Sequence, residues 1–355
     1  MTTIPRSRFY VPPPRPLVWL FALALWLVNT VYSVWSLVPY AISQFPVSDW
    51  WGIDAYRVYD ASKNMLQGHA YYADSTLFYS PLAVVLGAPA TLIPRAYAVL
   101  VLALLKVLLV IWVTRWLSRG SWLALLLVLT SLPVMNDLML GNLAIPITAA
   151  MAVSTFGESR RRSGIAIGIV AAAIAKPLLA PYFIWLVVCR RKTAEGALVT
   201  ATVLTLLTAV VVGPAAYVDW LNNLFHGTSL IGSWNGNFGL SAYLPAIAVP
   251  VAALVMALTL LVVARASESK SLIWVLAAGI LVSPYAGWYS AVPLLLALVV
   301  LRPWPRVYAI AIMQPLASVS IALLGFVAML AAPFGAVAPM KARPGATIAP
   351  LSEDP

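Results

Sequence analysis

Residues 160–192 read RRRSGIAIGIVAAAIAKPLLAPYFIWLVVCRRK, two basic clusters separated by apolar sequence. Lys176 and Pro177 interrupt the apolar part near its middle. Proline removes a helical hydrogen bond and clashes with the preceding turn, so it ends or breaks a helix. In membrane proteins basic clusters collect on one side, which a hairpin of 164–176 and 177–189 satisfies and one long helix does not. The sequence therefore predicts a helical hairpin with Lys176 at its tip.

The composition of the chain is that of a membrane protein with many spans. Of its 355 residues, 62% are hydrophobic and 9% are charged, whereas about a quarter of the residues of a soluble domain are charged. The net charge of +11 is carried by small clusters between apolar runs, which reports topology and argues against a nucleic-acid partner. Cys189 is the single cysteine, so there is no disulfide framework. We expect an all-α polytopic membrane protein.

About 11–12 apolar segments account for most of the length. They are 17–41, 81–94, 96–117, 121–135, 139–156, 164–176, 177–189, 195–213, 243–264, 272–283, 288–301 and 307–331. Several are shorter than the roughly 20 residues of a spanning helix, and short helices at membrane depth are tolerated where they line a cavity. We expect one transmembrane catalytic domain over 17–331, a basic cytoplasmic tail before it (1–16) and a disordered tail after it (332–355).

The basic clusters set the orientation of this domain. They are Arg6/Arg8/Arg15, Arg115/Arg119, Arg160–Arg162, Arg190–Lys192, Arg265/Lys270 and Arg302/Arg306. All face the cytoplasm if 81–94 dips into the membrane without crossing and if 272–283 and 288–301 form a second hairpin. On that topology two outer loops, 42–80 and 214–242, lie outside the cell membrane. We expect polar groups from distant parts of the chain to meet on that face.

Further polar residues follow this division between the two sides. A hairpin tip at Asn136-Asp137 lies outside together with Lys176 on the predicted topology. Three glutamates lie inside, namely Glu158, Glu195 and Glu268. The outer face therefore holds the candidate site.

The first outer loop contains the stretch Asp49-Trp50-Trp51-Gly52-Ile53-Asp54-Ala55-Tyr56-Arg57-Val58-Tyr59-Asp60. Three of the 11 acidic residues of the chain fall within it. Carboxylates beside a membrane are costly and are therefore functional candidates. Asp54 precedes a short amphipathic helix and could accept a proton from a sugar hydroxyl as a general base. The alternative is that these aspartates only cap and solvate that helix.

The lysines inside apolar sequence need an explanation, because a lysine at the bilayer centre costs about 2.5–3.5 kcal/mol. For Lys176 a lipid-linked phosphate would supply the anionic partner, and snorkelling from the hairpin tip is the alternative. Arg57 and Arg95 could share such a phosphate or anchor the chain at the interface. Lys106 lies in an unbroken apolar run, and we expect it either to find a polar partner or to snorkel.

Aromatic side chains on the outer side could stack on a sugar or form an interfacial belt. They are Tyr71, Tyr72, Tyr79, Trp234, Tyr285, Trp288 and Tyr289. His69 and His226 are isolated, and the sequence has no Asp-x-Asp pair and no Gly-rich phosphate loop. We therefore expect neither a metal nor a cofactor.

Motifs along the chain resemble, in order, those of a known family. Gly52-Ile53-Asp54, Tyr59-Asp60-Ala61, Leu66-Gln67-Gly68 and Phe78-Tyr79-Ser80-Pro81 resemble the first outer loop of the polyprenol-phosphate-sugar glycosyltransferases of superfamily C, family eighty-seven. The later matches are Leu140-Gly141-Asn142, Ala175-Lys176-Pro177, Asn235-Gly236-Asn237 and Val282-Ser283-Pro284 with Trp288. That family includes mannosyltransferases of mycobacterial phosphatidylinositol mannoside synthesis. The chain departs from its pattern at Ser80, Asn142 and Tyr289.

The resemblance implies a glycosyltransferase-C-like bundle and an inverting transfer of a sugar, with mannose favoured. The donor would be a polyprenyl-phosphate sugar and the acceptor a lipid or glycan hydroxyl outside the membrane. Asp54 would be the general base, and Lys176 with Arg57 would bind the donor phosphate. Substrate contacts would come from Tyr59, Tyr79, Asn142, Asn237, Trp288 and Tyr289.

Two alternatives stay open at this point. The same chemistry could use another lipid-linked sugar, such as arabinofuranose. A transporter or flippase of a lipid-linked substrate is a different class of function. Such a protein should carry ionisable residues at the midplane of both half-repeats, whereas here the carboxylates cluster in an outer loop.

Overall fold

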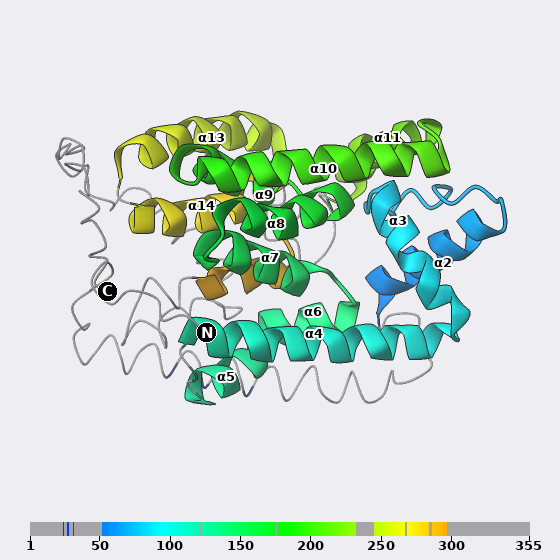
Figure 1. Ribbon diagram of the computed structural model, residues 1–355, viewed down its shortest axis with the longest axis horizontal. Coiled ribbons are helices and arrows are strands. Elements are labelled where there is room, and N and C mark those ends of the chain that lie inside the picture. The colour runs from blue at the N-terminus through cyan, green and yellow to red at the C-terminus, as the bar shows by residue number, and fades with distance from the viewer. Residues whose placement is uncertain are drawn as a thin grey trace, which may run out of the picture.

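The computed structural model describes residues 52–118, 120, 122–174, 176–231, 245–266, 268–283 and 286–296, with isolated positions 24, 27 and 31. All regular elements in these residues are helices (Figure 1). They are α2 (Ile53–Leu66), α3 (Pro81–Gly87), η2 (Ala88–Leu92), α4 (Arg95–Ser118), α5 (Trp122–Leu129), α6 (Leu132–Leu140), α7 (Ala144–Phe156), α8 (Arg160–Ile174), α9 (Leu179–Cys189), α10 (Arg191–Val212), α11 (Ala215–Ile231), η3 (Pro245–Ile247), α13 (Ala248–Arg265), α14 (Glu268–Val282) and η4 (Trp288–Leu296). The prediction of an all-α protein is confirmed.

Long apolar helices lie on two sides of the bundle. Within the described ranges, three helices are long and apolar enough to cross a membrane: Arg95–Leu117, Arg191–Val212 and Ala248–Arg265. Figure 1 shows α4 on one side and α10 with α13 on the other, with α7, α8, α9 and α14 between them. Large apolar side chains of the long helices are exposed, which suits lipid and not water. The chain is an integral, multi-pass membrane protein.

Short helices fill the space between the long ones. α7 has 13 residues, and its Ile145, Ile147 and Met151 are each at most 2% exposed. The Tyr182 hydroxyl of α9 lies 2.7 Å from the hydroxyls of both Ser154 and Thr155 on α7. The prediction that several segments are short or broken is therefore confirmed.

The expected boundaries were wrong between residues 121 and 140. The sequence suggested one segment over 121–135 and a loop tip at Asn136-Asp137, but α5 ends at Leu129 and both tip residues lie inside α6. Pro133 lies in the first turn of α6, where a missing N–H costs no hydrogen bond. A proline that begins a helix was thus mistaken for part of a continuing run.

The chain reverses between α8 and α9, as predicted. A Cβ atom added to Gly164 on α8 would overlap the carbonyl oxygen of Thr193 on α10, and one on Gly196 would overlap that of Arg161. The first turns of α8 and α10 therefore touch. Since α9 connects these two helices in sequence, it must run in the opposite direction and return the chain to the same end. The break falls at Lys176-Pro177, so the predicted reversal with Lys176 at its tip is confirmed, although α8 packs on α10 and α9 packs on α14.

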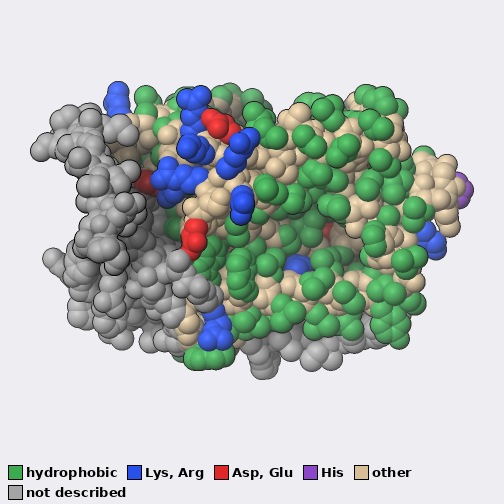
Figure 2. Space-filling model, in the orientation of Figure 1, with side chains coloured by type: hydrophobic (Ala, Val, Ile, Leu, Met, Phe, Trp, Pro, Cys, Tyr) green, Lys and Arg blue, Asp and Glu red, His purple; other side chains and the backbone are tan. Residues whose placement is uncertain are grey.

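Basic residues gather at one end of the helices, called here the basic end. It carries the clusters Arg160–Arg162 and Arg190–Lys192, which the hairpin brings together. Arg190 pairs with Glu268 at the start of α14, with 2.5 Å between Nη2 and Oε1. The ends of α4 and α7 lie close by, since Trp116 meets Phe156 edge-on and the α7–α8 turn follows directly. Figure 2 shows Lys and Arg side chains concentrated toward one end of an otherwise largely apolar face.

The close approach of α8 and α10 predicts a strict need for glycine at position 164. We expect Gly164→Ala to lower stability, because overpacking costs about 1–3 kcal/mol and the helix propensity of alanine returns at most about 1 kcal/mol. The measurement is the thermal unfolding midpoint of the purified protein in detergent. Ile169→Ala, on the exposed side of the same helix, is the control and should change the midpoint little. An alanine variant at 164 as stable as the wild type would contradict this packing.

Candidate active site

Two glycines bring α2 onto the end of α6, opposite the basic end. Gly52 and Gly141 have φ angles of 81° and 69°, in the left-handed region that glycine adopts without strain. The Gly52 N–H donates to the Met139 carbonyl oxygen over 2.6 Å. A Cβ on Gly141 would lie 2.8 Å from the Cβ of Ala55, so only glycine allows this contact. The first turn of α2, which carries Asp54, is therefore fixed against the turn that carries Asn142.

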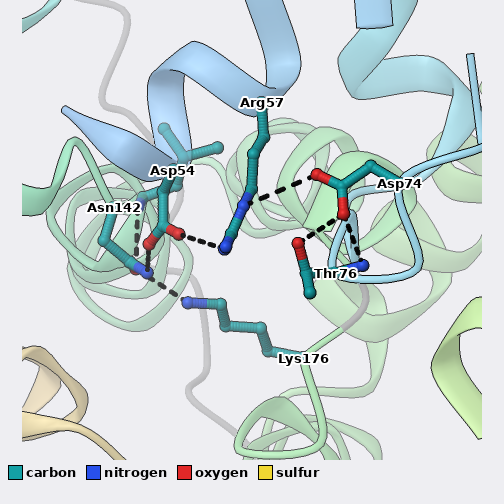
Figure 3. Close-up of polar contacts among 7 residues, drawn as sticks. Asp54, Arg57, Asp74, Thr76, Asn142 and Lys176 are labelled. Atoms are coloured by element: carbon teal, nitrogen blue, oxygen red, sulfur yellow. Dashed lines mark hydrogen bonds and ion pairs between the residues drawn. The ribbon is translucent and has the colours of Figure 1, made fainter. Parts of the chain in front are cut away.

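The side chain of Asn142 joins the two principal candidates of the sequence (Figure 3). Its Nδ2 donates to Asp54 Oδ2 over 2.6 Å, and its Oδ1 accepts from Lys176 Nζ over 2.7 Å. Oδ1 also accepts the Leu143 backbone N–H over 2.8 Å, which fixes which way the amide faces. Asn142 is 2% exposed. A carboxylate from α2 and an ammonium from the α8–α9 tip are thus held by one buried amide.

Arg57 lies between two carboxylates on the more open side of this cluster. Its guanidinium is 3.5 Å from Asp54 Oδ1 and 3.7 Å from Asp74 Oδ2. Asp74 also accepts from the backbone N–H and the hydroxyl of Thr76 (Figure 3). Since Asp54 receives bonds from Arg57 and Asn142, its carboxylate serves the cluster and not the cap of its own helix. Neither contact of Arg57 is short, and its side chain is 19% exposed.

Helix α11 holds the loop that carries Asp74. Asn223 donates to the carbonyl oxygen of Asp74 over 2.9 Å, and Trp220 donates to that of Phe78 over 3.0 Å. The predicted outer loop over 214–242 therefore contains a helix that clamps the first outer loop. Ser80 ties the same loop to α8, because its hydroxyl donates to the Ala172 carbonyl oxygen near the end of that helix over 2.5 Å.

Lys176 lies outside the long helices, in the turn between α8 and α9. Its ammonium sits 4.7 Å from the centroid of the Tyr289 ring, a cation–π contact. Burial lowers the pKa of Lys176 to about 8, although the nearby carboxylates of Asp54 and Asp137 act in the opposite direction. The group is charged below that pH and loses its charge as the pH rises through it. Its partner is an amide oxygen, which leaves the positive charge available to an anion.

The remaining predicted substrate residues differ in where they lie. Tyr79 is buried near the cluster, where burial and then Asp54 raise the pKa of its phenol, so it stays a neutral donor. Tyr289 contacts Lys176 as described. Tyr59 points elsewhere, since its hydroxyl donates to the Ile93 carbonyl oxygen over 2.9 Å. Asn237 and the side chain of Trp288 lie outside the described residues.

Sequence reasoning missed the partner of Lys106. This lysine, in the middle of α4, forms an ion pair with Asp137 of α6, and both side chains are at most 2% exposed. The open choice for Lys106 is thereby decided in favour of a polar partner. Two opposite charges in neighbouring apolar segments would have been a signal for this pair, because each is costly in the membrane alone.

Metal binding was not expected, and that stays a prediction. Among the residues that the structure describes, no three of the types His, Cys, Asp and Glu lie together as metal ligands would.

Comparison with known proteins decides the family. A model of glycosyltransferase family 87 matches residues 77–284, more than half of the chain. The chain belongs to glycosyltransferase family 87. No curated protein and no solved structure matches it. Since the family consists of polytopic membrane proteins that transfer sugars, this family 87 protein is a membrane-bound glycosyltransferase.

The matched region divides the cluster of this family 87 enzyme. Residues 77–284 include Tyr79, Asn142 and Lys176, whereas Asp54, Arg57 and Asp74 precede it and Tyr289 follows it. The cation and the bridging amide therefore lie in the part that defines the family. The carboxylate that they meet lies in α2, outside it.

Replacing Gly141 should disturb the contact between the first turn of α2 and the end of α6. Gly141→Ala introduces both a strained φ and the overlap with Ala55, whereas Gly68, with φ 72° and nothing within 4 Å of an added Cβ, isolates the strain alone. We expect Gly68→Ala to cost about 1–2 kcal/mol and Gly141→Ala to cost more, as read from unfolding midpoints in detergent. Equal losses in the two variants would mean that the Gly141–Ala55 contact does not fix α2.

Proposed function

We propose that this chain is an inverting glycosyltransferase that moves a sugar from a polyprenyl-phosphate carrier to a hydroxyl of a lipid or glycan acceptor on the extracytoplasmic face. Asp54 is the general base of this transfer, and Lys176 with Arg57 receives the charge of the departing phosphate. The observation that carries the proposal is the Asn142 amide, hydrogen-bonded to Asp54 and to Lys176. No metal is required, because the leaving group takes its charge to fixed cations.

The chemical step balances with the groups present in the cluster. The acceptor oxygen bonds to the anomeric carbon and gives its proton to the Asp54 carboxylate. The bond between that carbon and the phosphate oxygen breaks, and its electron pair leaves with the polyprenyl phosphate. Base and cation lie on either side of Asn142, so acceptor and leaving group can occupy opposite faces of the sugar. That arrangement inverts the anomeric centre.

The charge distribution supports an extracytoplasmic site. The cluster lies at the ends of α2, α6 and α8, and the basic end lies at the opposite ends of α8 and α10. Because Lys and Arg near membrane-spanning helices favour the cytoplasmic side, the cluster faces outward. A donor with its lipid tail in the outer leaflet can then present its phosphate to Lys176.

Mannose is proposed as the sugar on the basis of the motif resemblance, with arabinofuranose or another lipid-linked sugar as the alternative. The contacts of the cluster recognise features common to all of these donors, namely a phosphate and a hydroxyl. A comparison of radiolabelled donors that differ only in the sugar distinguishes between them.

Removing the charge of Asp54 tests the base. We expect Asp54→Asn to lower kcat about 100- to 10,000-fold, the range of general base catalysis, in membranes supplied with a radiolabelled polyprenyl-phosphate sugar. Asp60→Asn is the matched control on the same helix, since Asp60 is half exposed and pairs with Arg95 instead. Full turnover by a folded Asp54→Asn enzyme would exclude Asp54 as the base.

The lowered pKa of Lys176 predicts an alkaline limit of the reaction. As the pH rises through about 8, the ammonium of the free enzyme loses the charge that would receive the donor phosphate, so kcat/KM should fall. Lys176→Arg should remove this fall, because a guanidinium stays charged over the range. The measurement is kcat/KM against pH in detergent, for the wild type and this variant. An alkaline fall that persists in the arginine variant belongs to another group.

A further inference from the structure

A second pair of charges is buried next to the site. Lys106 is 1% exposed and Asp137 is fully buried. Their ion pair joins the middle of α4 to α6. Its carboxylate does not contact Asp54 or Arg57, and the function proposed above makes no use of it.

The contacts of Asp137 converge on the turn that carries Asn142. α6 ends in a Schellman motif, in which Gly141 has a positive φ and the Asn142 N–H donates to the Asp137 carbonyl oxygen over 3.2 Å. Lys106 Nζ donates to the same carbonyl oxygen over 2.6 Å. The backbone carbonyl oxygen of Asp137 thus accepts hydrogen bonds from both the Asn142 N–H and the Lys106 ammonium.

The carboxylate of Asp137 holds the other side of the same turn. Its Oδ2 accepts the Ile145 backbone N–H over 3.1 Å, in the first turn of α7. Asp137 therefore bonds to Asn142 within the turn 141–143 and to Ile145 just after it. Lys106 neutralises the charge that makes this possible, since an unpaired carboxylate there would be very costly to bury.

We propose that Lys106 and Asp137 are a positioning pair, which fixes the orientation of the Asn142 amide toward Asp54 and Lys176. The pair acts through the α6–α7 turn and does not touch substrate. This role rests on the proposed function only where turnover is the measurement. Its structural part, a turn held by the pair, stands without it.

The test uses the double variant Lys106→Met/Asp137→Asn, which removes both charges together and leaves no buried charge unpaired. The matched control is Arg190→Met/Glu268→Gln, which removes an ion pair at the basic end. Hydrogen exchange is followed over peptides that cover residues 141–145. We expect exchange there to rise about tenfold in the first variant and to stay unchanged in the control.

Turnover supplies the second readout. We expect the Lys106/Asp137 variant to lower kcat about 10- to 100-fold, as small misplacements of catalytic groups do. Combined with Asn142→Ala it should add no further loss, because both changes remove the same contact. Losses that multiply, an unchanged exchange rate at 141–145, or a rise spread evenly over α4, α6 and α7 would each overturn the positioning role. If the wild type transfers no sugar, the proposed function fails, and the exchange measurement still decides this inference.

Discussion

The amide of Asn142 can donate and accept at the same time, and the arrangement of the site follows from that property. A carboxylate and an ammonium placed in direct contact would neutralise each other and leave little for a substrate. With an amide between them, the Asp54 carboxylate receives a donor and the Lys176 ammonium receives an acceptor. The two groups are thus oriented without meeting directly, and the direct cation contact of Asp54 is the one with Arg57. The bridging group must itself be immobile, and Asn142 is almost fully buried.

Close backbone contacts supply that immobility. Glycines at the start of α2 and at the end of α6 let the two helices meet with no side chain between them. Gly164, Gly168 and Gly196 do the same between α8 and α10. The turn that carries Lys176 therefore follows a helix that is closely packed against its neighbour. Interiors packed this tightly have few alternative arrangements. The positions of the polar side chains therefore depend on the close glycine contacts between α2 and α6 and between α8 and α10.

Much of this arrangement could be predicted from the sequence, because it follows from local rules. Lys176 before a proline in an apolar run indicated a break, and equal basic clusters on its two sides indicated a reversal. Asp54 stood out as an acid at the start of an amphipathic helix beside the membrane. Position 137 was misjudged because a proline that opens a helix and one that interrupts it look the same in a single sequence. Opposite charges in neighbouring apolar segments hint at the pairing of Lys106 with Asp137, but whether they meet depends on how α4 and α6 pack.

The length of α8 also sets the distance between the basic end and the turn that carries Lys176. Its 15 residues span at most about 22 Å at a rise of about 1.5 Å per residue, whereas the hydrocarbon layer is about 30 Å thick. Counted from the arginines at its first turn, the helix stops short of the far boundary. On the function proposed above, the donor phosphate would therefore bind below the headgroup plane of the outer leaflet and not level with it.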